Sequence, residues 1–164
     1  MTRHLCAAAL VALVLAGCGG GSGTRETQAD KEAVAQWANG LHSWGSAMNR
    51  SINGISLLFS RPADVRGIQA GNHRVGALLA RYDRTLAGCS ARVRQLGAAP
   101  VPLALARGEA LHACVSLERA ASLIRRGVVA FQRGLGPGLL NSTSEPLAAG
   151  EDGVRRAVLD VTQG

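Results

Sequence analysis

The sequence predicts an all-α protein: an up-and-down antiparallel four-helix bundle with a short fourth helix, preceded by an apolar leader and a flexible linker. Three observations predict this class. Apolar residues recur at steps of three and four along most of the chain, which is the spacing of one helix face. Prolines and glycines interrupt the pattern between segments. No stretch shows the alternation of a strand, and no repeat is evident.

Residues 1–17 have the three parts of an export signal. Arg3 and His4 form a short basic head, residues 5–15 are apolar, and small residues follow. The eleven apolar residues span only about 16 Å as a helix, against roughly 30 Å for a bilayer core. We therefore expect a signal peptide that is cleaved, not a transmembrane helix.

The end of this leader, Leu15-Ala16-Gly17-Cys18, is similar to the lipobox of bacterial lipoprotein precursors. The resemblance covers residues 1 to about 27 and no more of the chain. It implies that a diacylglyceryl group is joined to the Cys18 sulfur and that cleavage occurs before Cys18. It also implies a bacterial cell-membrane protein on the extracytoplasmic face. An ordinary secretory signal that happens to end in cysteine is the alternative.

The residues after the leader predict a tether and then one domain. Residues 19–24 are glycine, serine and threonine, with no apolar side chain to bury, and such chain behaves as a flexible coil. We assign residues 18–27 to the lipidated cysteine and its tether, and residues 28–164 to a helical bundle domain. The 147 residues left after cleavage are enough for one hydrophobic core.

The first two predicted helices cover residues 28–60 and 63–97, and Pro62 separates them. Asn72 is the one polar position in the second stripe, so we expect either a register-setting core residue or a ligand contact. The first stripe consists of Val34, Trp37, Leu41, Trp44, Met48, Ile52, Ile55 and Phe59. The second consists of Val65, Ile68, Asn72, Val75, Leu79, Tyr82, Leu86, Cys89, Val93 and Leu96.

The last two predicted helices cover residues 103–135 and 145–162. The first of them has a seam of small residues, which allows close helix approach. Ser142 and Glu145 have capping-box spacing at the start of the second. That helix is the weaker prediction, because Gly150 and Gly153 each cost about 1 kcal/mol in a helix interior.

Cys89 and Cys114 are the two cysteines that remain once Cys6 is removed with the leader and Cys18 takes the lipid. Outside the cytoplasm such a pair forms a disulfide by default. For Cys89 and Cys114 to lie at equal heights on antiparallel helices and form this bond, the third helix must start late, near Ala106. One pair lacks the further ligands of a zinc site, so we predict no metal.

No cofactor and no catalytic residue is predicted. The segment from Glu109 to His112 matches the Glu-x-x-His motif of di-iron bundles, but the chain has no second copy. His42, His73 and His112 lie at different heights along the bundle, so no two of them meet as haem ligands. We expect all three at the boundary of the core. No Gly-x-Ser-x-Gly motif and no prominent carboxylate pair suggests an enzyme.

The charge of the chain is +7 and is almost entirely arginine, since Lys31 is the only lysine. A nucleic-acid site wants a clustered basic face with stacking aromatic residues. Aromatic residues are scarce and arginines occur along every helical segment, so we predict no nucleic-acid partner. A diffuse attraction to anionic lipid or polymer stays open.

The short fourth helix predicts an exposed apolar groove. It rises only about 27 Å, roughly half the length of the other three, so the half of the bundle near the tether lacks its fourth helix. We expect a partner helix, a lipid chain or a second copy of the domain to fill the groove. The alternative is that residues 19–30 or a bent first helix cover it. The groove residues are Val34, Trp37, Leu41, Leu86, Cys89 and Val93.

Three functions follow from these features. The first is a membrane-anchored envelope lipoprotein whose non-catalytic domain binds an envelope protein or cell-wall polymer. The second is a carrier of a small molecule or lipid in an apolar inter-helix groove. The third is an enzyme of unrecognised type. The anchor, the tether and a helical domain without a recognisable site favour the first.

Overall fold

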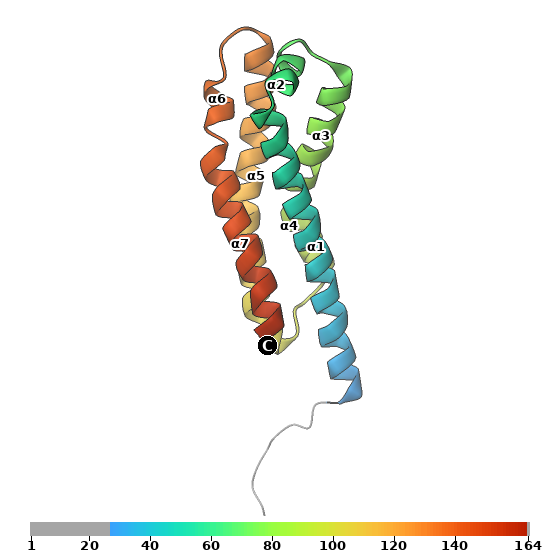
Figure 1. Cartoon of the computed structure of the whole chain (residues 1–164). Coiled ribbons are helices and arrows are strands. Elements are labelled where there is room, and N and C mark those ends of the chain that lie inside the picture. Colours follow the sequence, from blue (N-terminus) through green and yellow to red (C-terminus); the bar gives the residue numbers. More distant parts are fainter. Residues whose placement is uncertain (1–26, 164) are drawn as a thin grey trace, which may run out of the picture.

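The computed structural model describes residues 27–163, and within this range all regular secondary structure is helical. The prediction of an all-α helical bundle is confirmed. The helices run roughly along one long axis (Figure 1). Leu15, Ala16, Gly17, Cys18 and the tether up to residue 26 lie outside the described residues. The elements are α1 (Gln28–Ser60), α2 (Pro62–Gln69), α3 (His73–Ala87), α4 (Cys89–Gln95), the 3-10 helix η1 (Val101–Leu103), α5 (Ala104–Gln132), α6 (Gly138–Asn141) and α7 (Ser144–Gln163).

Helix α1 has the bounds that the sequence predicts. Thr27 and Asp30 form a capping box at its start: each side chain accepts a hydrogen bond from the backbone N–H of the other. Extended backbone at Arg61, before Pro62, ends the helix. The first turns of α1 reach beyond the other helices (Figure 1). Of residues 28–36, all are exposed except half-buried Val34.

The helix predicted over residues 63–97 is three shorter helices, α2, α3 and α4. Gly71 has a φ of +67°, which ends α2 and which glycine adopts without steric cost. Asn72 then caps α3, since its side-chain oxygen accepts hydrogen bonds from the N–H groups of Arg74 and Val75 at 3.0 and 3.3 Å. Asn72 is exposed, so the prediction of a core position is wrong. Spacing alone does not separate a cap from a seam residue.

Helices α6 and α7 lie antiparallel to α5 and close against it. In this register the end of α7 falls beside the first turns of α5, so helical segments accompany α5 along most of its length. The predicted half-bundle without a fourth helix is therefore wrong, because α6 extends the short α7 and α5 begins only at Ala104. The register follows from three contacts: Leu140 with Gly127, Leu117 with Gly150, and Ala113 with Gly153.

The hydrophobic core follows the predicted stripes. Helix α5 contributes small residues, including Ala106, Ala110 and Ala113, which are at most 1 % exposed. Before α7, the capping box predicted between Ser142 and Glu145 is absent, because the Ser142 hydroxyl donates a hydrogen bond to the carbonyl of Gly138 instead. The buried stripe of α1 consists of Trp37, Leu41, Trp44, Met48, Ile52 and Ile55.

Candidate functional site

Cys89 and Cys114 form the predicted disulfide, with a Cα–Cα distance of 5.3 Å. Both cysteines are fully buried and join α4 to α5. The pairing is possible because η1 delays the start of α5 to Ala104, close to the late start that equal heights require.

The predicted groove near the tether end is closed, so this prediction is wrong for the described residues. Trp37 is 5 % exposed, and only Val34 of the predicted lining is half-buried. Two contacts close the region: Leu96 packs on Gly40, and Val158 of α7 packs on Gly45. The buried members are Trp37, Leu41, Leu86, Cys89 and Val93.

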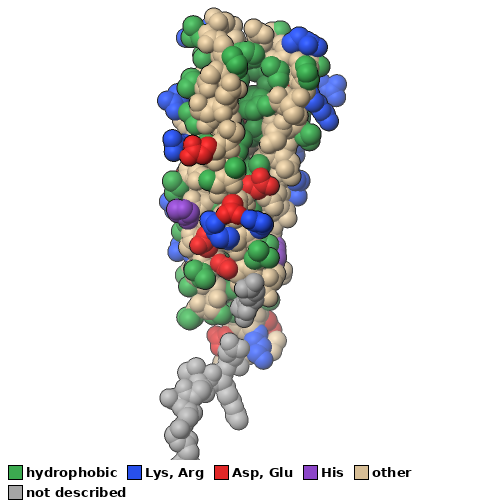
Figure 2. Space-filling model, turned by 60° about the vertical axis from the view of Figure 1, so that its left-hand side comes forward, with side chains coloured by type: hydrophobic (Ala, Val, Ile, Leu, Met, Phe, Trp, Pro, Cys, Tyr) green, Lys and Arg blue, Asp and Glu red, His purple; other side chains and the backbone are tan. Residues whose placement is uncertain are grey.

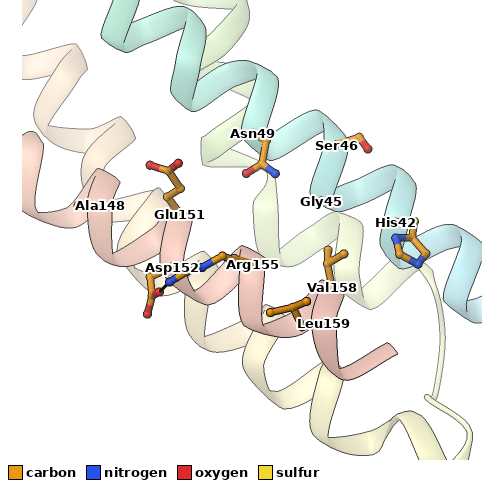
Figure 3. A pocket seen from close by; sticks show the side chains of 10 residues that line it. All are labelled: His42, Gly45, Ser46, Asn49, Ala148, Glu151, Asp152, Arg155, Val158 and Leu159. Atoms are coloured by element: carbon orange, nitrogen blue, oxygen red, sulfur yellow. Dashed lines mark hydrogen bonds and ion pairs between the residues drawn. The ribbon is translucent and has the colours of Figure 1, made fainter. Parts of the chain in front are cut away.

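A groove of about 520 Å³ with both polar and apolar lining residues lies between α1 and α7 (Figure 3). Helix α1 lines it with His42, Ser46 and Asn49, and α7 lines it with Glu151 and Arg155 among others. The Arg155 guanidinium is turned along its own helix toward Asp152, to which it donates a hydrogen bond. The cation of this groove is therefore already neutralised.

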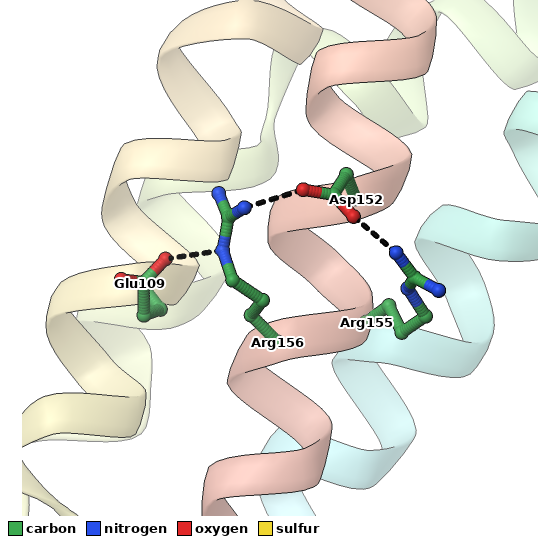
Figure 4. Close-up of polar contacts among 4 residues, drawn as sticks. All are labelled: Glu109, Asp152, Arg155 and Arg156. Atoms are coloured by element: carbon green, nitrogen blue, oxygen red, sulfur yellow. Dashed lines mark hydrogen bonds and ion pairs between the residues drawn. The ribbon is translucent and has the colours of Figure 1, made fainter.

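The same neutralisation extends along the outer face of α7 (Figure 4). Arg156 donates to Asp152 and, at 3.1 Å, to Glu109 of α5. The hydrogen bond from Arg155 and the charge of Arg156 hold the pKa of Asp152 below the 3.8 of an unperturbed aspartate. Acidic and basic side chains lie side by side on this face in Figure 2, which leaves it without a strong net charge.

Two further hollows lie toward the end of the bundle farthest from the tether. One, of about 440 Å³, separates α1 and α2 from α6, and apolar side chains such as Phe59, Val65 and Phe131 line it (Figure 2). The other, of about 660 Å³, lies between α3 and α5. In it, buried Asp83 accepts hydrogen bonds from Arg125 at 3.0 and 3.1 Å.

The arginine cleft, a hollow of about 680 Å³ between α1 and α3–α4, differs from the others in its charge. Arg50 stands on its α1 wall, and Arg81, Arg84 and Arg92 stand on its α3–α4 wall. All four are exposed, and none forms an ion pair with a described residue. No carboxylate lines the cleft. The remaining lining residues are Ala47, Ser51, Asn53, Gly54, Leu57, Tyr82 and Thr85.

Helix packing explains why these arginines share one cleft. Tyr82 crosses from α3 and lays its ring on α1, where a Cβ on Gly54 would lie 2.4 Å from the ring. Arg50 precedes Gly54 by about one helical turn on α1, and Arg81 adjoins Tyr82 on α3, so this contact brings both arginines to the same cleft. The ring is half-buried and forms part of the cleft lining.

The sequence prediction missed this cluster because it counted arginines without the carboxylates between them. Residues 50–94 contain eight arginines and two aspartates, a net charge of +6. Residues 95–163 contain seven arginines and six carboxylates, a net charge of +1. The excess charge is therefore confined to one part of the chain, and the local ratio of signs would have indicated it.

Of the three histidines, His42 is half-buried at the core boundary as predicted, whereas His73 and His112 are exposed. Residues 27–163 contain no group of three or more His, Cys, Asp or Glu side chains that could hold a metal ion. None of the described helices is both long enough and apolar enough to cross a bilayer.

Comparison with protein-family models, with curated proteins and with solved structures found no match to this chain. The function is therefore inferred from the chemistry of the chain itself.

Proposed function

We propose that this chain is the precursor of a bacterial envelope lipoprotein. Lipidated Cys18 holds it on the extracytoplasmic face of the cell membrane, and its helical domain is a non-catalytic binding or structural unit. The observation that carries the proposal is Leu15-Ala16-Gly17-Cys18 at the end of a short apolar leader. The sulfur of Cys18 is the nucleophile that such lipidation requires.

Two features of the described residues support this proposal. The buried disulfide between Cys89 and Cys114 suits an oxidising compartment, because disulfides are rare in the cytosol. The exposed first turns of α1 follow the glycine-rich tether directly and reach past the rest of the bundle (Figure 1). They act as a rigid spacer between the membrane and the domain.

The domain itself fits an up-and-down arrangement of four antiparallel passes. We assign α1 to the first, α2, α3 and α4 together to the second, α5 to the third, and α6 with α7 to the fourth. In this arrangement the arginine cleft lies between the first and second passes. In the proposed extracytoplasmic location its partner is an envelope protein or cell-wall polymer, and we propose no nucleic-acid partner; Tyr82 is the only aromatic side chain that lines the cleft and could stack on bases.

The substitution Cys18→Ser tests the anchor. We expect this variant to accumulate as an unprocessed, unacylated precursor, because serine lacks the thiol that accepts the lipid. Cys6→Ser is the matched control, since Cys6 lies within the leader and should leave processing and acylation unchanged. Mass spectrometry of the N-terminal peptide gives the readout. An acylated Cys18→Ser chain of mature size would contradict the proposal.

A lipid or small-molecule carrier is the second candidate, and the apolar hollow between α1 and α6 favours it (Figure 2). The volume of this hollow, about 440 Å³, lies within the range of roughly 300–1,000 Å³ that is typical of ligand pockets. A native mass spectrum distinguishes the two functions. A stoichiometric co-purified lipid that is lost in Phe131→Glu would favour the carrier, whereas ligand-free protein favours the binding module.

A further inference from the structure

We propose that the arginine cleft binds a linear, phosphodiester-linked polymer of the cell envelope. This inference rests on the proposed extracytoplasmic location and names the partner class that the cleft recognises. Its starting point is the charge of residues 50–94, which carry a net +6. Arg50, Arg81, Arg84 and Arg92 converge on one cleft from both walls.

No carboxylate of the neighbouring helices neutralises this cleft. Asp83 follows Tyr82 on α3 but is buried in the hollow between α3 and α5, which Arg84 also lines, and there it pairs with Arg125 at 3.0 Å. Asp64 lines the adjoining hollow near the start of α2, beside Arg61 and Arg74. The arginine side chains therefore keep their hydrogen-bond donors available for an anionic ligand. The two other polar surfaces, along α7 and at Asp83, contain internal ion pairs.

The chemistry of the lining favours phosphodiesters joined by hydroxylated units. Guanidinium groups donate two parallel hydrogen bonds to a phosphate, which gives both strength and orientation. Asn53, Thr85 and Tyr82 stand among the arginines and supply neutral hydrogen-bonding groups. A polymer that alternates phosphate with polyol or sugar presents groups suited to both kinds of side chain. At about 680 Å³ the cleft has the size of a ligand site.

The position of the cleft favours a polymer over the anchoring membrane. Arg50 lies 22 residues beyond Gln28 in the uninterrupted helix α1, about 33 Å along its axis. The field of lipid headgroups falls off within a Debye length of about 8 Å at physiological salt. The cleft is also recessed between α1 and α3–α4, with buried Ser51 and half-buried Tyr82 in its lining, so a chain enters it more readily than a planar surface does.

Titration of the processed full chain in nonionic detergent with poly(glycerol phosphate) tests the proposal. The cleft triple variant Arg81→Gln/Arg84→Gln/Arg92→Gln should bind the polymer at least about tenfold more weakly, since three exposed ion pairs are lost. The control triple variant is Arg119→Gln/Arg126→Gln/Arg133→Gln, which removes the same charge at exposed positions outside the cleft. It should weaken binding less than about twofold. Equal losses would overturn the proposal, because they indicate diffuse attraction to the net charge.

A single substitution on the α1 wall of the cleft provides a test that does not depend on whether the triple variant folds. Arg50→Gln changes one exposed side chain of α1 and should weaken binding about threefold, with an unchanged circular dichroism melting curve. Unchanged affinity in Arg50→Gln would overturn the assignment of the cleft. Polyglutamate at equal charge is the second probe, and binding as tight as that of the phosphate polymer would overturn phosphate recognition.

The membrane alternative is tested with the chain reconstituted through its own anchor. Polymer binding should be the same in phosphatidylcholine vesicles and in vesicles that also contain phosphatidylglycerol. Loss of polymer binding in the anionic vesicles would show that lipid headgroups occupy the cleft, and would overturn the polymer. The titration in detergent does not depend on the acyl chains, and mass spectrometry of Cys18 tests the anchor separately. Failure of the anchor and failure of the cleft are therefore distinguishable.

Discussion

Gly153 stands at a close approach of α7 to α5, and Gly153→Ala should destabilise the domain although it improves helix propensity. An ideal Cβ at this position would lie 2.8 Å from the Cβ of Ala113 and 3.2 Å from its Cα. Alanine has no rotamer that moves its Cβ aside, and the Cα belongs to the helix backbone. The added methyl group therefore forces the two helices apart or distorts them.

The expected loss follows from two opposing effects. Overpacking a well-packed core costs roughly 1–3 kcal/mol, and we take the upper part, about 2–3 kcal/mol, because the contact at Gly153 involves backbone. Replacing glycine by alanine inside a helix gains about 1 kcal/mol. The net loss in the free energy of unfolding is therefore about 1–2 kcal/mol.

Gly108→Ala is the matched control in α5, because no atom lies within 4 Å of the added Cβ. It should stabilise the domain by about 1 kcal/mol, so the two alanine variants should differ by about 2–3 kcal/mol. Urea unfolding of the disulfide-intact chain, followed by circular dichroism, measures this as a shift in midpoint at constant slope. Gly153→Ala as stable as Gly108→Ala would refute the close approach of α5 and α7. The double variant Ala113→Gly/Gly153→Ala should be more stable than the sum of the two single changes, which corresponds to a favourable coupling energy between the two positions.

Two further predictions concern covalent and charged contacts. Replacing both Cys89 and Cys114 by alanine should lower the free energy of unfolding by about 3.5 kcal/mol, since the disulfide closes a loop of 25 residues. Thiol labelling of the unfolded, unreduced chain should find no free thiol at either cysteine. Labelling of both cysteines would disprove the bond. Because the pKa of Asp152 is lowered, its contribution to stability is present above the ordinary aspartate pKa of 3.8 and is lost as pH falls through the lower folded pKa. In the double variant Arg155→Gln/Arg156→Gln, the pKa of Asp152 should return toward 3.8, which a carboxyl titration followed by NMR measures. An unchanged pKa would exclude the two arginines as the cause of the lowering.

Local chemistry determined much of this molecule. The bounds of α1 follow from a capping box at Thr27 and from Pro62, whose effects act within a turn of chain. The buried stripe from Trp37 to Ile55 follows from spacing, because a helix places every third or fourth residue on one face. The pairing of Cys89 with Cys114 was predictable since no other cysteine follows Cys18.

Tertiary structure decided the features that depend on which helices meet. Asn72 continues the apolar spacing, yet it caps α3 because Gly71 turns the chain just before it. Gly150 and Gly153 weaken an isolated helix, but in the fold they let α7 approach α5 closely enough to run beside it to its first turn. The groove which helix lengths alone predicted at Trp37 is closed by two other contacts, Leu96 with Gly40 and Val158 of α7 with Gly45.

The arginine cleft illustrates the same limit at the surface. Arg50 lies on α1, whereas Arg81 and Arg92 lie 31 and 42 residues further along the chain. Their excess over carboxylates is visible in the sequence, but their common cleft exists only because Tyr82 packs on Gly54 and sets the height of α3 against α1. Sequence therefore determined the sign of the charge, and helix packing determined its location, since side chains distant in sequence meet only through the contacts of their helices.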